Sequence, residues 1–152
     1  MRKHKGFSLI ELLIVVAIIL IIAAIAIPNL IRSKMAANES SAVASLRTIN
    51  TAEVTYNNTY PGTFGTLAQL GPNANPCVTP TSAGACLIDA LLSAGTKSGY
   101  TFTVSGDMTT TYATLAKPTA TNTGTRAFCS DVNLVLYYSA TSSGCTVGTN
   151  PL

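Results

Sequence analysis

Lys5-Gly6-Phe7-Ser8-Leu9-Ile10-Glu11 opens a long apolar run that continues from Leu12 to Ile27 and contains only Leu, Ile, Val and Ala. Together with its flanks, about 25 residues predict a helix roughly 37 Å long, which is enough to cross the apolar core of a bilayer. A helix that is apolar on every side must be buried in lipid or against other helices. This segment therefore decides the fold.

One acid, Glu11, lies inside this apolar segment, near its start. A carboxylate at the centre of a bilayer costs roughly 2.5–3.5 kcal/mol on insertion scales, and less near the interface. An ionisable residue in such a place indicates a function and calls for a partner of opposite charge.

The stretch KGFSLIELLIVVAII resembles the class III signal of type IV pilins and of the pseudopilins of type II secretion. The resemblance extends over about the first 60 residues. It implies that a prepilin peptidase cleaves between Gly6 and Phe7 and that Phe7 is then N-methylated. It also implies that Glu11 pairs with the N-terminal amine of a neighbouring subunit during assembly. Two charges that are costly alone in an apolar bundle are tolerated together, and each selects the register of the other.

Two alternatives remain open for this N-terminus. Arg2, Lys3 and Lys5 followed by an apolar run and Ala24-Ile25-Ala26 also describe an ordinary secretory signal peptide. The length of the run, the acid within it and the Gly-Phe junction before it argue against that interpretation. A plain membrane anchor is the other alternative.

Composition points away from an ordinary soluble domain. Only 10% of the 152 residues are charged, compared with roughly 25% in typical soluble domains. The polar surface must therefore consist largely of Ser, Thr, Asn and Gly, which suits an extracellular protein packed against other subunits.

The net charge of +3 comes from the three basic residues of the first six. Nine basic residues less those three leave six, which six acids balance. No basic patch indicates a strong nucleic-acid site. The basic N-terminus instead predicts a cytoplasmic N-terminus and an exported C-terminus, a bias that Arg32 and Lys34 weaken but do not reverse.

The cysteine count of four is even, which in an exported domain indicates two disulfides. Three pairings are possible. We favour Cys77–Cys86 and Cys129–Cys145, because each closes a short local loop.

The remaining sequence predicts an α+β fold in which one helix, from about residue 8 to 59, packs on an antiparallel sheet of about four strands. Apolar residues between Met35 and Tyr60 share one helical face, and Glu39 and Ser45 fall largely off it. Tyr60-Pro61-Gly62 ends the helix. The strand candidates are residues 100–105, 110–116, 126–130 and 133–138, and residues 64–70 and 86–93 are candidates for short helices.

Together with the resemblance, which implies the leader and the filament role, these patterns predict four parts: a leader over 1–6, a transmembrane and filament-core helix over 7–31, the amphipathic half of that helix over 32–60, and a head over 61–152. The head consists of a loop region, the sheet and a disulfide-closed C-terminal region. Pro28 predicts a kink or a local loosening of the helix. In the family, the segment before such a proline can lose helical hydrogen bonding in filaments; a merely bent helix is the alternative.

An enzymatic function is not expected, because no histidine remains after leader removal and no phosphate-binding glycine loop is present. No cofactor and no metal are expected either. The chain has no CxxC motif for zinc, and only Asp131 lies beyond residue 110 among the acids that a calcium site would need.

The resemblance implies a structural subunit of a type IV pilus, serving adhesion, motility or DNA uptake. A type II secretion pseudopilin is the alternative. The implied partners are identical subunits in a helical homopolymer, the prepilin peptidase and an assembly platform in the inner membrane. The precursor would be a single-pass protein of the bacterial inner membrane, and the assembled form an extracellular pilus.

Overall fold

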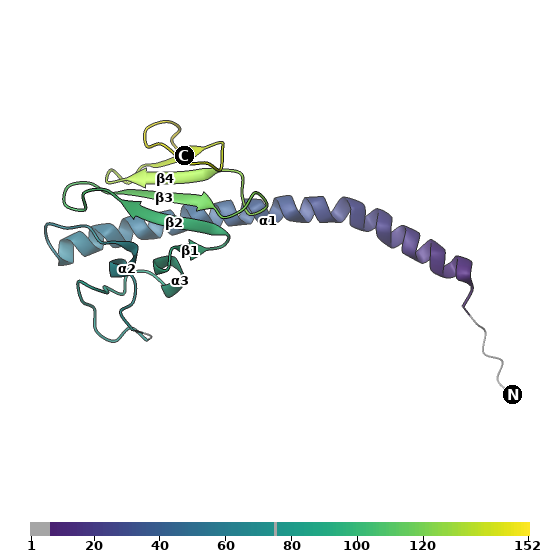
Figure 1. Ribbon diagram of the computed structural model, residues 1–152, viewed down its shortest axis with the longest axis horizontal. Coiled ribbons are helices and arrows are strands. Elements are labelled where there is room, and N and C mark those ends of the chain that lie inside the picture. Colours follow the sequence, from purple (N-terminus) through teal and green to yellow (C-terminus); the bar gives the residue numbers. More distant parts are fainter. Residues whose placement is uncertain (1–6, 75) are drawn as a thin grey trace. The chain divides into compact units, whose positions relative to one another are not determined.

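A computed structural model describes residues 7–74 and 76–152 (Figure 1). The chain divides into two compact units, of which the first ends at Lys34 and the second comprises Met35–Leu152. A single long helix, α1, runs from Leu9 to Thr59, so it begins in the first unit and ends in the second. Each unit is described by itself below.

Helix α1 is continuous through Pro28. Proline lacks the backbone N–H that would bond to the carbonyl four residues earlier, yet the helix accommodates this missing bond without a break. The loss of helical hydrogen bonding that the resemblance implies concerns the assembled filament, so it stays a prediction.

The second half of α1 buries the face that the sequence predicted. Ala42, Leu46, Ile49 and Tyr56 are all at most 2% exposed, which confirms the helical spacing. The expectation for two polar residues was wrong, because Glu39 and Ser45 are also buried. Both lie beside the apolar stripe and face other parts of the head.

Two short helices follow α1 in the sequence and precede the first strand of the sheet. Helix α2 spans Leu67–Leu70 and begins at a capping box, in which Thr66 and Gln69 bond reciprocally. Helix α3 spans Ala90–Ser93, and the carboxylate of Asp89 caps it by accepting the N–H of Leu92. Both fall within the predicted helical stretches but are shorter.

The sheet is antiparallel, with five strands in the order β1-β2-β3-β4-β5. The prediction of about four strands missed β1, which has only two residues. Strand β2 has the predicted bounds, and β3 to β5 follow the other three predicted segments with shifted ends. Their bounds are β1 Thr96–Lys97, β2 Tyr100–Ser105, β3 Ala113–Pro118, β4 Ala127–Asp131 and β5 Leu136–Ser139.

Side-chain turns explain why two strands begin later than predicted. The Asp107 carboxylate accepts the N–H groups of Thr109, Thr110 and Thr111, which holds this segment in a turn before β3. In the same way, the Asp131 carboxylate accepts the N–H of Asn133. Residues 132–135 therefore form a turn rather than the start of β5.

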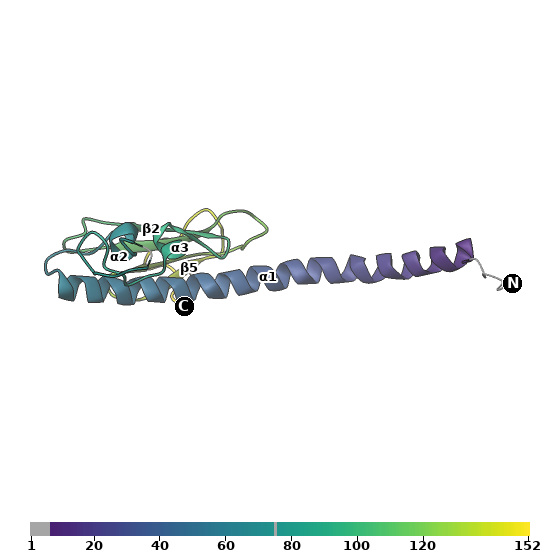
Figure 2. The same ribbon diagram turned by 90° about the horizontal axis from the view of Figure 1, so that it is seen from below.

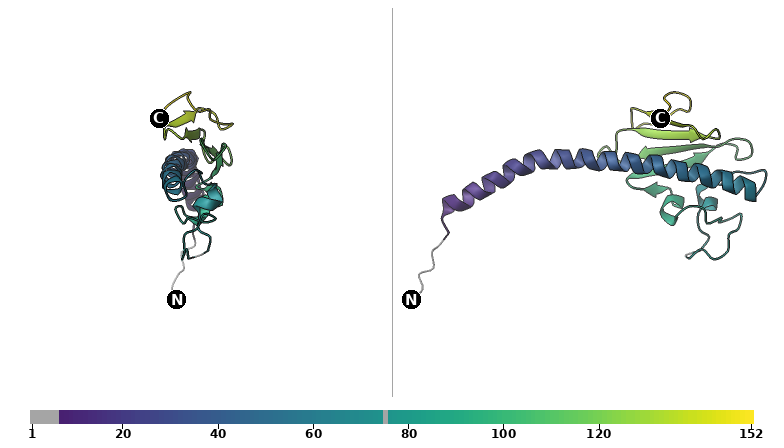
Figure 3. Two further views of the ribbon diagram at one scale, coloured as in Figure 1. Left: turned by 90° about the vertical axis from the view of Figure 1, so that its left-hand side faces the viewer. Right: turned by 180° about the vertical axis from the view of Figure 1, so that it is seen from behind.

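The second half of α1 lies along one face of the sheet, and the two form the layers of the head (Figures 2 and 3). The core between them also takes in the segment that contains α2 and α3. Its buried apolar members are Ala42, Leu46, Ile49, Ala52, Tyr56, Leu70, Ala85, Ile88, Leu92, Tyr100, Phe102, Ala116 and Phe128. The C-terminal residues return to the sheet, where Tyr138 N–H donates to Asn150 and Leu152 N–H donates to Leu136.

Candidate functional site

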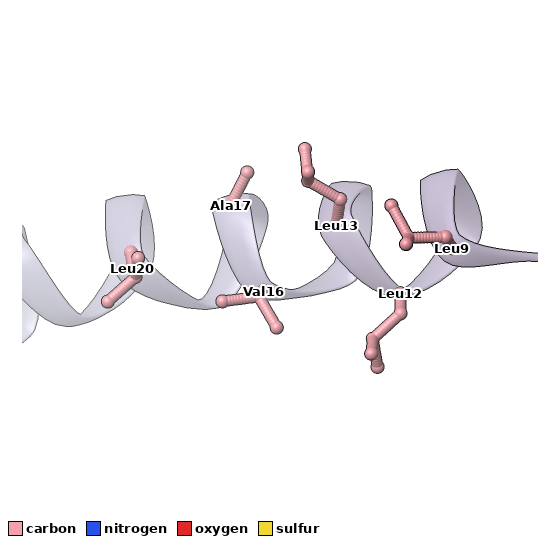
Figure 4. A pocket seen from close by; sticks show the side chains of 6 residues that line it. All are labelled: Leu9, Leu12, Leu13, Val16, Ala17 and Leu20. Carbon is pink, nitrogen blue, oxygen red and sulfur yellow. The ribbon is translucent and has the colours of Figure 1, made fainter.

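The first unit presents an uncovered apolar surface. Its side chains are exposed along the helix, from Leu9 at 80% to Leu30 at 70%. Figure 4 shows six of them, which project from the helix and line an open apolar pocket with a volume of about 490 Å³: Leu9, Leu12, Leu13, Val16, Ala17 and Leu20. An apolar surface of this extent marks a membrane or protein contact. Among the described residues, one helix, α1, is both long enough and apolar enough to span a membrane.

Glu11 lies in the first turn of α1, on this exposed surface. Its N–H donates to the carbonyl of Ser8 at 3.1 Å, which closes that turn. Within residues 7–74 and 76–152, no basic side chain forms an ion pair with its carboxylate. The helix N-terminus, with its unpaired N–H groups, is a favourable place for an acid. A charged partner from outside this unit would still find the carboxylate accessible.

The predicted processing site lies at the edge of the described chain. Phe7 is 78% exposed, immediately before α1. Gly6 and the rest of the predicted leader lie outside the described residues. Phe7 and Glu11 are four residues apart, one helical turn, so the structure brings the two predicted assembly residues to the same end of α1.

In the second unit, Glu39 joins α1 to the segment before β4. Its Oε1 accepts from Thr125 N–H at 2.9 Å and Thr125 Oγ1 at 3.0 Å, and its Oε2 accepts from Arg126 Nε at 2.8 Å. Burial alone would raise the pKa of the Glu39 carboxyl, but the hydrogen bonds from Thr125 and Arg126 outweigh it and hold the pKa below its usual value. Sequence reasoning missed this contact.

A second polar contact lies in the core. Asn50 on α1 accepts from Ser130 Oγ at 2.8 Å, and Ser130 shares a further hydrogen bond with Thr114 at 2.6 Å. All three side chains are buried. They connect α1 to β3 and β4, which fixes how the helix lies on the sheet.

Glu53 is a further buried polar residue of α1 and is 0% exposed. Its Oε2 accepts the N–H of Gly65 at 2.8 Å, whereas Oε1 has no hydrogen-bond partner in the described chain. Burial raises the pKa of this carboxyl to about 7, although the bond from Gly65 acts in the opposite direction.

Two disulfides close loops in the head. Cys77 pairs with Cys86, with the Cα atoms 6.2 Å apart, and Cys129 pairs with Cys145, with the Cα atoms 5.7 Å apart. The first lies in the loop between α2 and α3. The second attaches the C-terminal segment to β4. No group of three or more candidate metal ligands occurs in the described parts of the chain.

Comparison with known proteins confirms the resemblance that the N-terminal sequence indicated. Residues 1–27 match the prokaryotic N-terminal methylation motif. The chain is similar to the type IV wide pilus major component PilA4 of Thermus thermophilus, with 43% identity over 79 residues, 50% of this chain and 60% of that protein. It is 48% identical to the type IV major pilin protein PilA of Myxococcus xanthus over 54 residues, 36% of this chain and 24% of that protein.

A relative from secretion systems is also similar. The type II secretion system core protein G of Vibrio cholerae is 38% identical over 66 residues, 41% of this chain and 45% of that protein. The matches thus span between 24% and 60% of the length of these three relatives. No solved structure matches the chain.

The chain thus has a pilin-like α+β fold, with a long N-terminal helix, an antiparallel sheet and a methylation motif over residues 1–27. The chain is homologous to type IV pilins and to the core protein G pseudopilins of type II secretion.

Proposed function

We propose that the chain is a structural, non-enzymatic subunit of a type IV pilus filament that polymerises through its N-terminal helix, in adhesion, motility or DNA uptake. The observation that carries the proposal is the uncovered apolar half of α1 with one accessible acid, Glu11, in its first turn. The similarity to two type IV pilins supports it.

The energetics of such a subunit follow from the apolar helix. Residues 7–31 rest in the inner membrane before assembly and in a bundle of like helices afterwards. Both environments are apolar, so the transfer gains little hydrophobic free energy. Helix packing and the pairing of Glu11 with the amine of a neighbouring Phe7 then decide the register. Contacts of this kind are head-to-tail and do not close, so they generate a helical fibre.

Processing precedes assembly in this proposal. The prepilin peptidase removes residues 1–6 after Gly6, and methylation of Phe7 follows. The N-terminus starts in the cytoplasm, an inner-membrane assembly platform extracts the subunit, and the head reaches the cell exterior. The motif match over residues 1–27 and the basic first residues support this order and orientation.

A pseudopilin of a type II secretion system is the second candidate, favoured by the similarity to core protein G. The two candidates differ in product, since a pilin forms long surface filaments at native expression. The scarcity of acids in the C-terminal half favours the pilin. By resemblance, a major pseudopilin would carry a C-terminal calcium site built from several acids, whereas only Asp131 lies beyond residue 110 here.

The experiment compares Glu11→Gln with Asp89→Asn, a control that removes an exposed acid of the head instead. Cells making each full-length variant are fractionated, and sheared filaments and membrane-inserted subunits are quantified. Glu11→Gln should leave membrane insertion unchanged and reduce filaments strongly, whereas Asp89→Asn should match the wild type. Normal filament abundance in Glu11→Gln would contradict the assembly role of Glu11.

A further inference from the structure

The turn between β4 and β5 exposes three aliphatic side chains together. Val132, Leu134 and Val135 are 37%, 46% and 39% exposed. Leu134 has a φ of 64°, a left-handed conformation that a bulky residue rarely adopts. The turn is held in this form, because Leu134 N–H donates to the Asp131 carbonyl at 2.9 Å. Backbone strain that presents an apolar side chain to solvent indicates a contact surface.

A groove of about 330 Å³ lies on another part of the head, along α1. It is lined by Arg47, Thr48, Thr51, Ala52, Thr55 and Leu87. The hydroxyl groups of Thr48, Thr51 and Thr55 donate back to helix carbonyls four residues earlier, at 3.1, 3.0 and 2.9 Å. The hydroxyl donors are thus used within α1, and the threonine methyl groups are left to contribute apolar surface to the groove.

The charges at the two surfaces are complementary. Arg47, at the groove, is exposed and forms no ion pair within the described residues. Asp131 begins the turn, and within the described residues its carboxylate accepts only from Asn133. A carboxylate has about four lone-pair sites, so Asp131 retains capacity for a further donor.

One head cannot fill its own groove with its own turn. The turn joins β4 to β5, at one edge of the sheet. The segment that contains Leu87 bonds to Leu70 of α2, and it leads into α3, which contacts β1 at the opposite edge. An occupant of the groove must therefore come from another molecule. Two separate surfaces on one head produce a contact that repeats from copy to copy.

We propose that the 131–135 turn of one head docks into the α1 groove of a second copy of this chain, with Leu134 among the threonine methyl groups and Asp131 beside Arg47. This inference rests on the proposed filament function and adds a head-to-head contact to the packing of the N-terminal helices.

The first test is cross-linking in sheared filaments of the full chain. The double variant Leu134→Cys/Thr51→Cys should give a ladder of covalent multimers on non-reducing gels, and peptide mapping should join positions 51 and 134. The single variants should give no ladder. The control Leu134→Cys/Thr103→Cys, with the second thiol on the exposed side of β2, should give none either. Filaments without a ladder, an equal ladder in the control, or a different protein linked to position 134 would overturn the contact.

The second test is charge reversal. Asp131→Arg and Arg47→Asp should each lower filament yield about fivefold, the effect of one exposed ion pair, and the double variant should recover most of it. Asp131 also holds its own turn, but a change at residue 47 would not repair a turn defect. Unchanged single variants, or a double variant no better than they are, would overturn the inference. If the unmutated chain still forms filaments in that case, the proposed function remains supported. If the unmutated chain forms no filaments, both the proposed function and this head contact are overturned.

Discussion

Arg126 Nη2 lies 2.8 Å from Glu39 Oε2, so one ion pair joins α1 to the residue that precedes β4. Eighty-seven positions separate the two residues in the chain. The Arg126 guanidinium also lies over the rings of Phe128 and Tyr138, at 5.6 and 5.8 Å from their centroids. The pair therefore connects the helix, β4 and β5 at one point.

Glu39→Ala should destabilise the head, because it leaves the N–H of Thr125 and the Arg126 side chain without their acceptor. The Arg126 side chain is 44% exposed and water replaces part of the loss, so we expect about 1–3 kcal/mol. Thermal unfolding of the full chain in detergent, followed by near-UV circular dichroism, measures the change. Ser40→Ala, one position along on the exposed side of α1, is the control; equal midpoints for both variants would contradict the role of Glu39.

Glu39 also predicts loss of stability in acid. Its folded-state pKa lies below the ordinary value of 4.5. The stability that its ionised form contributes is thus present above pH 4.5 and is lost as the pH falls through the lower folded-state pKa. The difference in stability between the wild type and Glu39→Gln should shrink towards low pH. A difference that stays constant from pH 7 to pH 2 would argue against an ionised Glu39 in the folded head.

From Glu53 we expect the opposite dependence of stability on pH, namely a loss of stability as the pH rises towards neutral. Its folded-state pKa is about 7, against an ordinary value of 4.5, so the neutral form is favoured in the folded head. The contribution of Glu53 to stability should be greatest below pH 4.5 and should decline as the pH rises to 7, by up to about 3 kcal/mol. Glu53→Gln keeps an acceptor for Gly65 and should remove this decline. Urea unfolding of the full chain in detergent at pH 5 and pH 8 measures it; parallel curves for wild type and variant would refute a neutral Glu53.

The Cys129–Cys145 disulfide should hold the C-terminal segment on the sheet. It closes a loop of 16 residues, for which loop-closure entropy gives a stabilisation of about 3 kcal/mol. Cys129→Ser/Cys145→Ser should speed hydrogen exchange at Tyr138 and Leu152, whose N–H groups pair the tail with β5. Cys77→Ser/Cys86→Ser is the matched control and should leave these two amides protected. Fast exchange in both double variants would show that the effect is not local to the tail.

The sequence predicts the helix and the sheet well, because both depend on periodic apolar side chains. Leu46, Ile49 and Tyr56 repeat at helical spacing, and β2 has the predicted bounds of Tyr100–Ser105. Strand ends were less predictable where a side chain forms a turn. Strands β3 and β5 begin later than predicted because the carboxylates of Asp107 and Asp131 accept hydrogen bonds from backbone N–H groups of the turns before them. The alternation of apolar and polar residues does not predict such hydrogen bonds.

The buried polar residues of α1 could not be predicted from the same pattern. The pattern placed Glu39 largely off the buried face and gave no role to Asn50, because a single sequence does not show partners such as Thr125 and Ser130, which lie 86 and 80 positions away. Glu53 has a nearer partner, but it is a backbone N–H of Gly65 and carries no residue-type signal. The N-terminal candidates behave differently. Gly6, Phe7 and Glu11 lie close together in one short stretch of sequence, so their motif is recognisable without the fold.

The most direct measurement is mass spectrometry of the intact chain and its N-terminal peptide from sheared surface filaments. We expect the chain to begin at an N-methylated Phe7 and to be abundant in the filaments. A processed chain found only in membranes would contradict the major-pilin function and favour the pseudopilin. A chain beginning at Ile27 would contradict the central claim, because the apolar segment would then be a discarded signal peptide rather than the filament core.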